Sequence, residues 1–234
     1  MIRQLSRRKT AVFLLSTMRS GSTLLKSLLA AAPDVSHLPE HDFQRYSSHN
    51  SWRIKTLSDK PIILMKRPAG YEEQDYPIVP SYSPAKAIVL FRDAYETVVS
   101  LRKMNEVAYP EITSHWTPER LLTQYWLPVT ESLWKYTQDH PGQHAWLRYE
   151  DLLTHPLENT MRLFSYIGSS QERGVDRYAP PDDYQWAWGN DDGGEKIKTN
   201  RVQPCILQRN DSELLSLIEE HEAIKSIRRV LGYG

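Results

Sequence analysis

The sequence predicts an α/β fold, a three-layer sandwich in which helices cover both faces of a central parallel sheet. Four short apolar runs have the length of buried strands. They alternate along the chain with segments whose apolar residues recur at helical spacing, which is typical of a parallel sheet covered on both faces. The length of 234 residues suits a single domain, over residues 1–234, with a core of ordinary size.

The first apolar run, residues 11–15, leads into a short polar loop and then into a helix. Leucines recur at helical spacing over residues 24–29, and Pro33 marks the end of this helix. The first N–H groups of a helix lack partners within it, and the helix dipole favours negative charge there. This arrangement predicts a site for a phosphate-like anion. The simpler alternative is an ordinary turn between a strand and a helix.

The loop that follows the first strand is close to the nucleotide-binding P-loop, G-x-x-x-x-G-K-[ST], so the predicted fold is P-loop-NTPase-like. Gly21 stands at the second glycine and Thr23 at the Ser/Thr position. Ser16 replaces the first glycine, and Ser22 replaces the lysine that reaches the β- and γ-phosphates of a triphosphate. The missing lysine argues against ATP or GTP as the reacting nucleotide. Arg19 supplies positive charge from within the loop, on a planar group that suits an oxyanion.

The composition is that of an ordinary globular protein without bulk charge. Hydrophobic residues make up 40% and charged residues 25%, and 29 basic residues balance 29 acidic ones. The net charge of zero gives no electrostatic reason to expect nucleic acid as a partner, so any anion site is local. The single cysteine, Cys205, is compatible with a reducing compartment. No run is long enough for a signal-peptide core or a membrane span, so we expect a cytoplasmic protein.

The second apolar run, residues 61–65, is followed by Lys66 and soon by Pro68. Pro68 ends the strand and leaves Lys66 at its carboxyl end. Because open parallel sheets bind ligands outside the carboxyl ends of their strands, Lys66 is a candidate site residue. The alternative is a solvated lysine, which is the more frequent situation at a strand end.

The third apolar run, residues 87–91, is followed directly by Arg92. Ser100 lies eight residues further on, two turns into the next predicted helix, so both side chains are expected to face the same crevice. In the alternative interpretation, Arg92 forms a surface ion pair with Asp93 or Glu96, worth under about 1 kcal/mol.

The remaining elements follow from apolar periodicity, capping residues and prolines. After a helix over residues 94–104, a long helix is expected over 117–139, with a kink at Pro128. Residues 144–148 form the fourth strand, and a helix over 157–167 ends at Gly168. The last helix is expected over 211–231. Three long loops are expected, at 34–58, 70–84 and 171–195.

Four segments, in this order along the chain, resemble the sulfotransferases that use 3′-phosphoadenosine 5′-phosphosulfate (PAPS). RSGSTLL at 19–25 resembles the family's 5′-phosphosulfate loop, and Arg92 with Ser100 resembles its 3′-phosphate pair. YEDL at 149–152 resembles a segment whose tyrosine lies near the adenine. IKTNRVQP at 197–204 resembles the loop that covers the nucleotide in bacterial and tyrosylprotein members. The resemblance implies the sulfotransferase fold and PAPS as cosubstrate, with adenosine 3′,5′-bisphosphate (PAP) as product.

The resemblance also implies which residues bind the donor. They lie in the first loop, after the third strand, in the YEDL segment and in the C-terminal loop. They are Arg19, Ser20, Gly21, Ser22, Thr23, Leu24, Arg92, Ser100, Tyr149, Lys196, Lys198, Thr199 and Asn200.

The catalytic residues implied by the resemblance point to the tyrosylprotein branch. PDVSHLPEH matches a segment of that branch whose glutamate is the catalytic base, and the match falls on Glu40. Lys66 matches a lysine in a K-x-P context. That branch also uses a serine in the C-terminal loop, where this chain has Thr199 and Asn200. The cytosolic branch uses a histidine base instead, so His37 and His41 remain rivals.

The expected reaction is sulfuryl transfer to an acceptor hydroxyl. Glu40 accepts the acceptor proton, and Arg19, Lys66 and the loop amides hold the sulfonate and bridging oxygen, without a metal ion. The acceptor is open between a small molecule, a glycan, a lipid, a carrier-bound metabolite and a peptide tyrosine. Two other functions compete. One is an atypical P-loop kinase, and the other is a catalytically silent nucleotide-binding scaffold.

Overall fold

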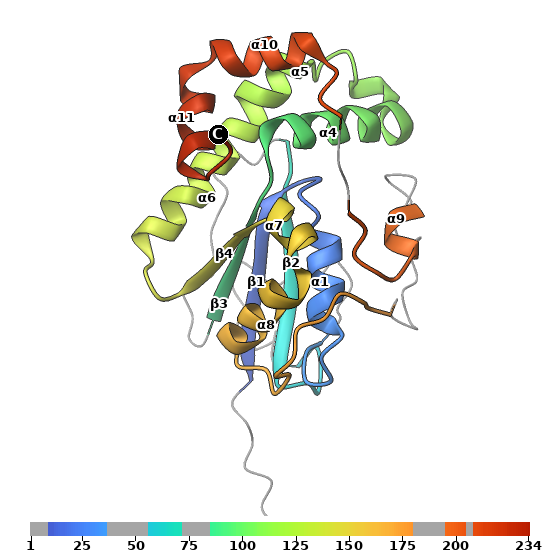
Figure 1. Cartoon of the computed structure of the whole chain (residues 1–234), viewed down its shortest axis with the longest axis vertical. Coiled ribbons are helices and arrows are strands. Elements are labelled where there is room, and N and C mark those ends of the chain that lie inside the picture. Colours follow the sequence, from blue (N-terminus) through green and yellow to red (C-terminus); the bar gives the residue numbers. More distant parts are fainter. Residues whose placement is uncertain (1–8, 37–55, 72–84, 180–194, 205–207) are drawn as a thin grey trace, which may run out of the picture.

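The computed structural model describes residues 9–36, 56–71, 85–179, 195–204 and 208–234. Their centre is a parallel sheet with the strand order β2–β1–β3–β4 (Figure 1). The strands are β1 (Thr10–Thr17), β2 (Ile62–Ala69), β3 (Ala85–Phe91) and β4 (His144–Arg148). Every pairing is parallel, so the predicted sheet is confirmed, with longer first and second strands than the apolar runs indicate.

The side chains of β1 show how the sheet separates two cores. Phe13 and Leu15 point into one hydrophobic cluster, while Val12 and Leu14 point into the other. All four side chains are fully buried, which is why the run is apolar throughout. The predicted three-layer arrangement is therefore confirmed.

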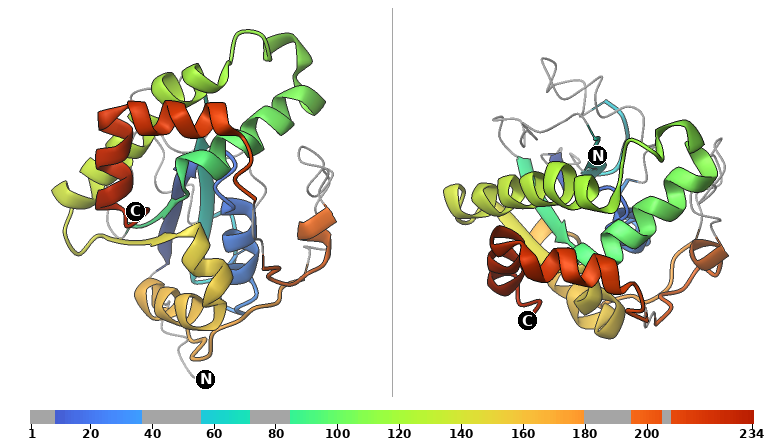
Figure 2. Two further views of the ribbon diagram at one scale, coloured as in Figure 1. Left: turned by 45° about the horizontal axis from the view of Figure 1, so that its top comes forward. Right: turned by 90° about the horizontal axis from the view of Figure 1, so that it is seen from above.

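Two sets of helices form the outer layers (Figures 1 and 2). The helices that contribute side chains to the cluster of Val12 are α1 (Ser22–Ala30), α7 (Tyr149–Thr154) and α8 (Pro156–Ile167). The helical segments that contribute to the cluster of Phe13 are α4 (Ala94–Ala108), η3 (Leu121–Trp126), α6 (Leu127–Asp139), α10 (Ser212–Glu220) and α11 (Glu222–Val230).

The predicted helix over 117–139 is present, but its middle is not α-helical. It is divided into α5 (Pro118–Arg120), the π-helical segment η3 and α6. The N–H of Leu127 donates to the carbonyl of Leu122, five residues back. Pro128 explains the wider turn, because its ring would collide with the carbonyl four residues earlier in an α-helix. The irregularity expected near Pro128 thus takes the form of a wider, π-helical turn directly before it.

The last predicted helix, 211–231, is also divided. His221 has extended backbone angles of φ −96° and ψ 101° and separates α10 from α11. The chain changes direction at this point, and α11 packs beside α6 (Figure 2). This break allows α11 to reach the end of β3, as described below. Two short helices, η2 (Pro110–Ile112) and α9 (Glu195–Lys198), complete the described elements.

Candidate active site

The loop between β1 and α1 has an unusual backbone. Arg19 has φ +63° and Gly21 has φ +83°, both in the left-handed region. A Cβ atom on Gly21 would lie 2.2 Å from Cε2 of Tyr149, so only glycine fits here. The hydroxyls of Thr17 and Ser20 share a hydrogen bond inside the loop. Helix α1 then begins without a side-chain cap, which leaves its first turn available to an anion.

Lys66 connects β2 to the first turn of α1. The prediction that Pro68 ends this strand is wrong, because β2 continues in register with β1 to Ala69, and Lys66 lies three residues before that end. Its ammonium donates to Oγ1 of Thr23 over 2.7 Å, and its side chain is only 7% exposed. Lys66 pairs in register with Leu14 of β1, so it faces the same side of the sheet as α1. The structure therefore brings together Lys66 and Thr23, two residues that the sequence places 43 positions apart.

Arg19, Arg92 and Ser100 form a second group beside the loop. Nε of Arg19 donates to Oγ of Ser100 over 3.1 Å, and Nη1 of Arg92 donates to the carbonyl of Arg19 over 2.5 Å. The Arg92 guanidinium also lies over the ring of Tyr149, 4.5 Å from its centroid. Its Nε is buried without a hydrogen-bond partner in the described part of the chain. Two guanidinium groups thus lie around one small loop.

The arginine after β3 does not form the surface ion pair that was the alternative interpretation. Asp93 is fully buried and accepts from Nε of Arg228 over 2.9 Å, and Glu96 pairs with Arg209 over 3.2 Å. Arg92 instead points toward the loop, as its contact with Arg19 demonstrates.

The described C-terminal loop packs against the chain near residue 178. Ile197 accepts a hydrogen bond from the Tyr178 hydroxyl over 2.7 Å, and Asn200, with φ +56°, accepts from the Tyr178 N–H over 3.0 Å. Thr199 donates to the carbonyl of Arg201. Ile197 packs against the same apolar cluster as Tyr149, so this loop lies on the α1 side of the sheet.

The remaining predicted site residues either lie in α1 and α9 or fall outside the residues that the structure describes. Ser22 is buried at the start of α1, and Leu24 packs against the cluster on that face. Helix α9 contains Lys196 and Lys198. Glu40, His41 and their rival His37 lie outside the described residues.

No sequence motif selected Tyr125, which contacts the loop between β1 and α1 from the segment η3. Its hydroxyl accepts from the N–H of Met18 over 2.6 Å and donates to the carbonyl of Ala69 over 2.7 Å. The local signal that could have pointed to it is Pro128, which follows Tyr125 and Trp126 closely and indicates that the helix is irregular there.

Glu150 was named only as part of a motif, yet it holds the turn that carries Arg92. Its carboxylate accepts from the N–H of Asp93 over 3.1 Å and from the Tyr233 hydroxyl over 3.0 Å. Burial raises the pKa of Glu150 above its ordinary value. No local pattern in the sequence indicates these contacts.

Comparison with known proteins decides the family. The model of the sulfotransferase domain matches residues 9–179, which contain all four strands, the loop between β1 and α1, Lys66, Arg92, Ser100 and Tyr149. The chain belongs to the sulfotransferase domain family. The resemblance found in the sequence is therefore confirmed, and family and fold together support an enzyme with sulfotransferase activity.

Solved sulfotransferase structures share this fold at low sequence identity. A sulfotransferase domain from the curacin biosynthetic pathway superposes with a TM-score of 0.61 and 17% identity over 98% of this chain and 99% of that one. A sulfotransferase from Alicyclobacillus acidocaldarius gives 0.56 and 11%, over 94% of each chain. A mouse sulfotransferase, SULT7A1, solved in complex with PAP, gives 0.54 and 12%, over 95% of this chain and 89% of that one. None of the curated proteins matches in sequence.

Two further features concern only the residues that the structure describes. Among them, no group of three or more histidine, cysteine or acidic side chains is arranged to hold a metal ion in this sulfotransferase domain. None of their helices combines the length and apolar character needed to cross a bilayer.

Proposed function

We propose that this sulfotransferase moves the sulfuryl group of PAPS to the hydroxyl of an acceptor. The observation that carries the proposal is the meeting of Arg19, Lys66 and Arg92 around one helix N-terminus, at the carboxyl ends of three parallel strands. Such an arrangement favours a ligand with more than one anionic group, because backbone N–H groups, the helix dipole and three cations are gathered around one loop.

Each end of the donor has its own set of residues in this proposal. The loop amides of Ser20 to Leu24, with Arg19 and Lys66, bind the 5′-phosphosulfate. Arg92 and Ser100 bind the 3′-phosphate, for which the buried Nε of Arg92 supplies a further donor. The ring of Tyr149 lies against the adenine. Lys196, Lys198, Thr199 and Asn200 close over the nucleotide.

The chemical step is an in-line transfer with Glu40 as the general base. The acceptor oxygen forms a bond to sulfur while the bond from sulfur to the 5′-phosphate oxygen breaks, and PAP leaves. Glu40 takes the acceptor proton, with His41 or His37 as the alternative base. Lys66 stabilises the charge that develops on the bridging oxygen, so no metal ion is required. A Glu40→Gln enzyme that binds PAP normally yet keeps full turnover would exclude Glu40 as the base.

Two observations support PAPS as the donor: the loop lacks the lysine of P-loop kinases, and a structurally similar sulfotransferase was solved with PAP. Ser22 stands where P-loop kinases have the lysine for the β- and γ-phosphates. The related mouse sulfotransferase was solved with PAP. A kinase or a silent nucleotide-binding scaffold are the competing functions. The acceptor hydroxyl belongs to a small molecule, glycan, lipid, carrier-bound metabolite or peptide tyrosine.

A thermal-shift comparison separates these functions. PAP, ADP and ATP are each added with and without Mg²⁺, at 100 to 1,000 times the dissociation constant, where a tight ligand stabilises by about 3 to 4 kcal/mol. We expect stabilisation by PAP without metal. A preference for ATP with Mg²⁺ would favour the kinase. If PAP binds, release of PAP from PAPS in an acceptor screen separates an enzyme from a scaffold.

A further inference from the structure

The π-helical segment η3 ends in two aromatic residues that reach opposite sides of the donor site. Tyr125 and Trp126 are 1% and 0% exposed, so neither can touch a bound nucleotide directly. They are neighbours in sequence, and each donates a hydrogen bond to a backbone carbonyl at the end of a different strand. The sites that they reach are those of the two phosphates of PAPS in the proposed function.

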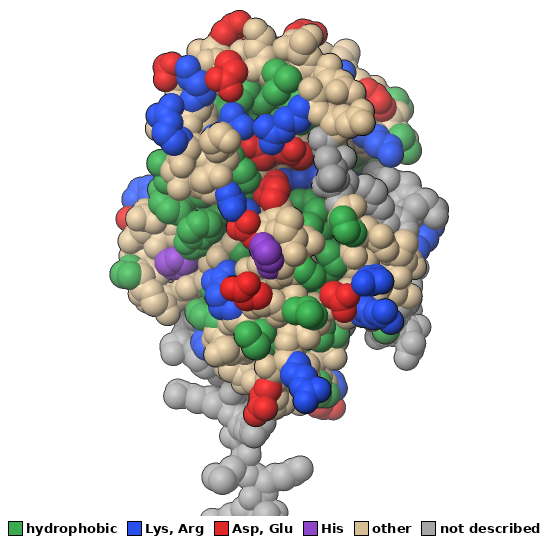
Figure 3. Space-filling view, viewed as in Figure 1, with side chains coloured by type: hydrophobic (Ala, Val, Ile, Leu, Met, Phe, Trp, Pro, Cys, Tyr) green, Lys and Arg blue, Asp and Glu red, His purple; other side chains and the backbone are tan. Residues whose placement is uncertain are grey.

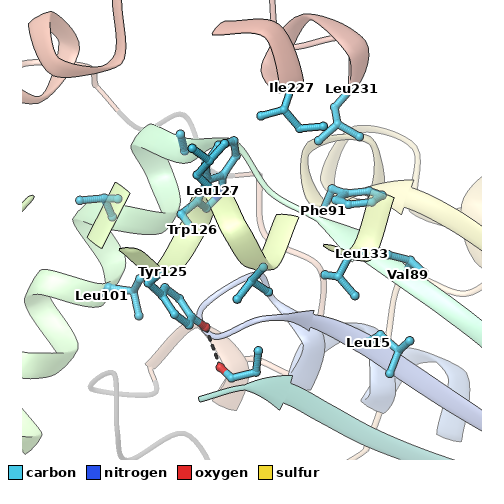
Figure 4. Close-up of a cluster of buried hydrophobic side chains, with 14 of the residues drawn as sticks. Leu15, Val89, Phe91, Leu101, Tyr125, Trp126, Leu127, Leu133, Ile227 and Leu231 are labelled. Carbon is cyan, nitrogen blue, oxygen red and sulfur yellow. Dashed lines mark hydrogen bonds between the residues drawn. The ribbon is translucent and has the colours of Figure 1, made fainter. Parts of the chain in front are cut away.

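Tyr125 lies under the proposed 5′-phosphosulfate loop. Figure 4 shows its hydroxyl pointing from the helix to the sheet, with a hydrogen bond to a strand carbonyl. That carbonyl belongs to Ala69, at the end of the strand that carries Lys66. The same hydroxyl accepts the N–H of Met18, at the start of the loop. One oxygen therefore ties the first residue of the loop to the end of β2, next to the sheet pairing of Thr17 with Ala69, and contributes to the position of the loop relative to Lys66.

Trp126 lies under the proposed 3′-phosphate site. Its indole N–H donates to the carbonyl of Arg92 over 3.1 Å. Arg92 is the first residue after β3, and its guanidinium lies between the carbonyl of Arg19 and the ring of Tyr149. The indole therefore fixes the backbone from which this guanidinium extends.

The π-helical turn explains how adjacent residues serve both sites. In an α-helix with 3.6 residues per turn, consecutive side chains point about 100° apart. The hydrogen bond from Leu127 to Leu122 spans five residues and puts more residues into the turn, so the angle between neighbours is smaller. Both rings can then face the carboxyl edge of the sheet. Tyr71 supports this arrangement, with its ring centroid 5.0 Å from that of Tyr125.

We propose that Tyr125 and Trp126 are positioning residues with separate roles, Tyr125 for the 5′-phosphosulfate loop and Trp126 for the arginine that binds the 3′-phosphate. This inference rests on the proposed function, because it assigns the two strand ends to the two phosphates of the donor. It predicts that the contributions of the two phosphates to binding are separable by single substitutions in η3.

The test measures binding of adenosine 5′-monophosphate, adenosine 3′-monophosphate and PAP by calorimetry to the full chain. Tyr125→Phe removes one oxygen, and we expect about tenfold weaker binding of the 5′-monophosphate with little change for the 3′-monophosphate. Trp126→Phe should give the opposite result. Tyr136→Phe and Trp134→Phe are matched controls, since both residues pack against the same cluster, and neither should affect either ligand.

Three results would overturn the inference. Equal weakening of both monophosphates by one variant would indicate a general structural defect, and unchanged affinities would indicate no role. Absence of PAP binding by the unmodified protein would overturn the proposed function together with this inference. The first two results, with PAP still bound by the unmodified protein, would overturn the inference alone.

A second measurement on the unmodified protein covers the case in which Trp126→Phe does not fold. The indole N–H resonance of Trp126 in ¹⁵N-labelled protein should shift on addition of adenosine 3′-monophosphate and stay in place with the 5′-monophosphate. A resonance that ignores the 3′-monophosphate, or responds equally to both ligands, would contradict the role of Trp126.

Discussion

At the scale of single residues, the donor loop concentrates backbone strain where the anion is proposed to bind. Arg19 adopts φ +63°, which costs a residue with a Cβ about 1 to 2 kcal/mol. Contacts with Ser100 and Arg92 hold it there. Gly21 adopts φ +83° and also borders Tyr149. The loop is therefore set by its surroundings before a ligand arrives, which lowers the conformational cost of binding.

Gly21 offers a test with a matched control. Gly142 has almost the same angle, φ +81°, but open space where its Cβ would lie. Gly21→Ala and Gly142→Ala should both lose about 1 to 2 kcal/mol of stability from the left-handed backbone. Only Gly21→Ala should also displace Tyr149 and weaken PAP binding, by about tenfold or more. Calorimetry and urea unfolding measure both quantities, and equal effects of the two substitutions on PAP would contradict this account.

Lys66 tests the assignment of charge within the site. Lys66→Met keeps the length of the side chain but removes the ammonium that contacts Thr23. Turnover of PAPS should fall by about a hundredfold or more, because the developing charge loses a donor. Affinity for PAP, which lacks the sulfonate, should change only a few-fold. Lys9→Met removes a lysine that donates to Ser58 far from the loop, and it should leave turnover intact. Unchanged kcat in Lys66→Met would exclude this role.

At the scale of elements, the buried carboxylate of Asp93 and the hydroxyl of its neighbour Tyr95 together join three helices. Asp93 caps α4 by accepting from the N–H of Tyr95 over 2.9 Å, and it also accepts from Arg228 of α11 over 2.9 Å. The Tyr95 hydroxyl accepts from the N–H of Asp211, the cap of α10. The C-terminal helices are thereby attached to the residue that follows Arg92, so helix packing and the donor site share one junction.

The contribution of the Asp93 ion pair to the unfolding free energy can be compared with that of a surface ion pair. Asp93→Ala removes the buried carboxylate from the Arg228 guanidinium, which then has only the exposed carboxylate of Glu219, 3.7 Å away, and we expect a loss of about 3 to 5 kcal/mol of unfolding free energy. Asp139→Ala breaks the exposed pair of Asp139 with Lys135 in α6 and should cost less than about 1 kcal/mol. Chemical denaturation of both variants measures the difference. Similar losses would mean that the Asp93 pair contributes no more than a surface contact.

At the scale of the whole molecule, charges of both signs are interspersed on the surface, while a few are buried near the site. Figure 3 shows acidic and basic side chains side by side on one face, in keeping with a net charge of zero. Glu150 differs from these, because it is half-buried and accepts hydrogen bonds from the Asp93 N–H and the Tyr233 hydroxyl. Its raised pKa makes the stability of the whole fold depend on pH.

The sign of that dependence follows from linkage. The folded state binds the Glu150 proton more tightly than the unfolded state, whose pKa is near the ordinary 4.5. The stabilisation from this group is therefore complete below that pH and is lost as the pH rises through the raised value. Burial raises the pKa of Glu96 as well, so Glu96 acts in the same direction.

Glu150→Gln isolates this contribution, because the amide is neutral at every pH and Glu96 remains. The unfolding free energy of the variant, minus that of the unmodified protein, should increase as the pH rises from about 4.5 and then level off. Urea unfolding at a series of pH values measures it. A difference that stays constant with pH would contradict the raised pKa.

Most of the fold, and the loop between β1 and α1 that we propose binds the donor, follow from local sequence signals. The apolar runs at 11–15, 61–65, 87–91 and 144–148 mark the strands because both faces of this sheet are buried. Their carboxyl ends meet at one edge in any parallel sheet, which is why Lys66 and Arg92 could be placed in one site from spacing alone.

The helix over 117–139 marks the limit of such reasoning. Apolar periodicity indicates that a helix is present, but it is nearly the same for an α-turn and for one wider turn. The hydrogen-bond pattern depends on the steric clash that Pro128 would cause in an α-helix and on the carbonyl of Ala69, which accepts a hydrogen bond from Tyr125 at the sheet edge. Periodicity therefore predicted the helix but not the turn that reaches the site.

The sequence by itself determined the sheet and the family, and it indicated the loop and most of the residues that we propose bind the donor, because these depend on local patterns that follow one another along the chain. Only the tertiary structure decided how those residues are held. The contacts of Arg19 with Ser100, of Asp93 with Arg228 and of Met18 with Tyr125 span 81, 135 and 107 positions. Side-chain hydrogen bonds across such separations leave no periodic trace in a sequence, because they are selected by the packing of whole elements.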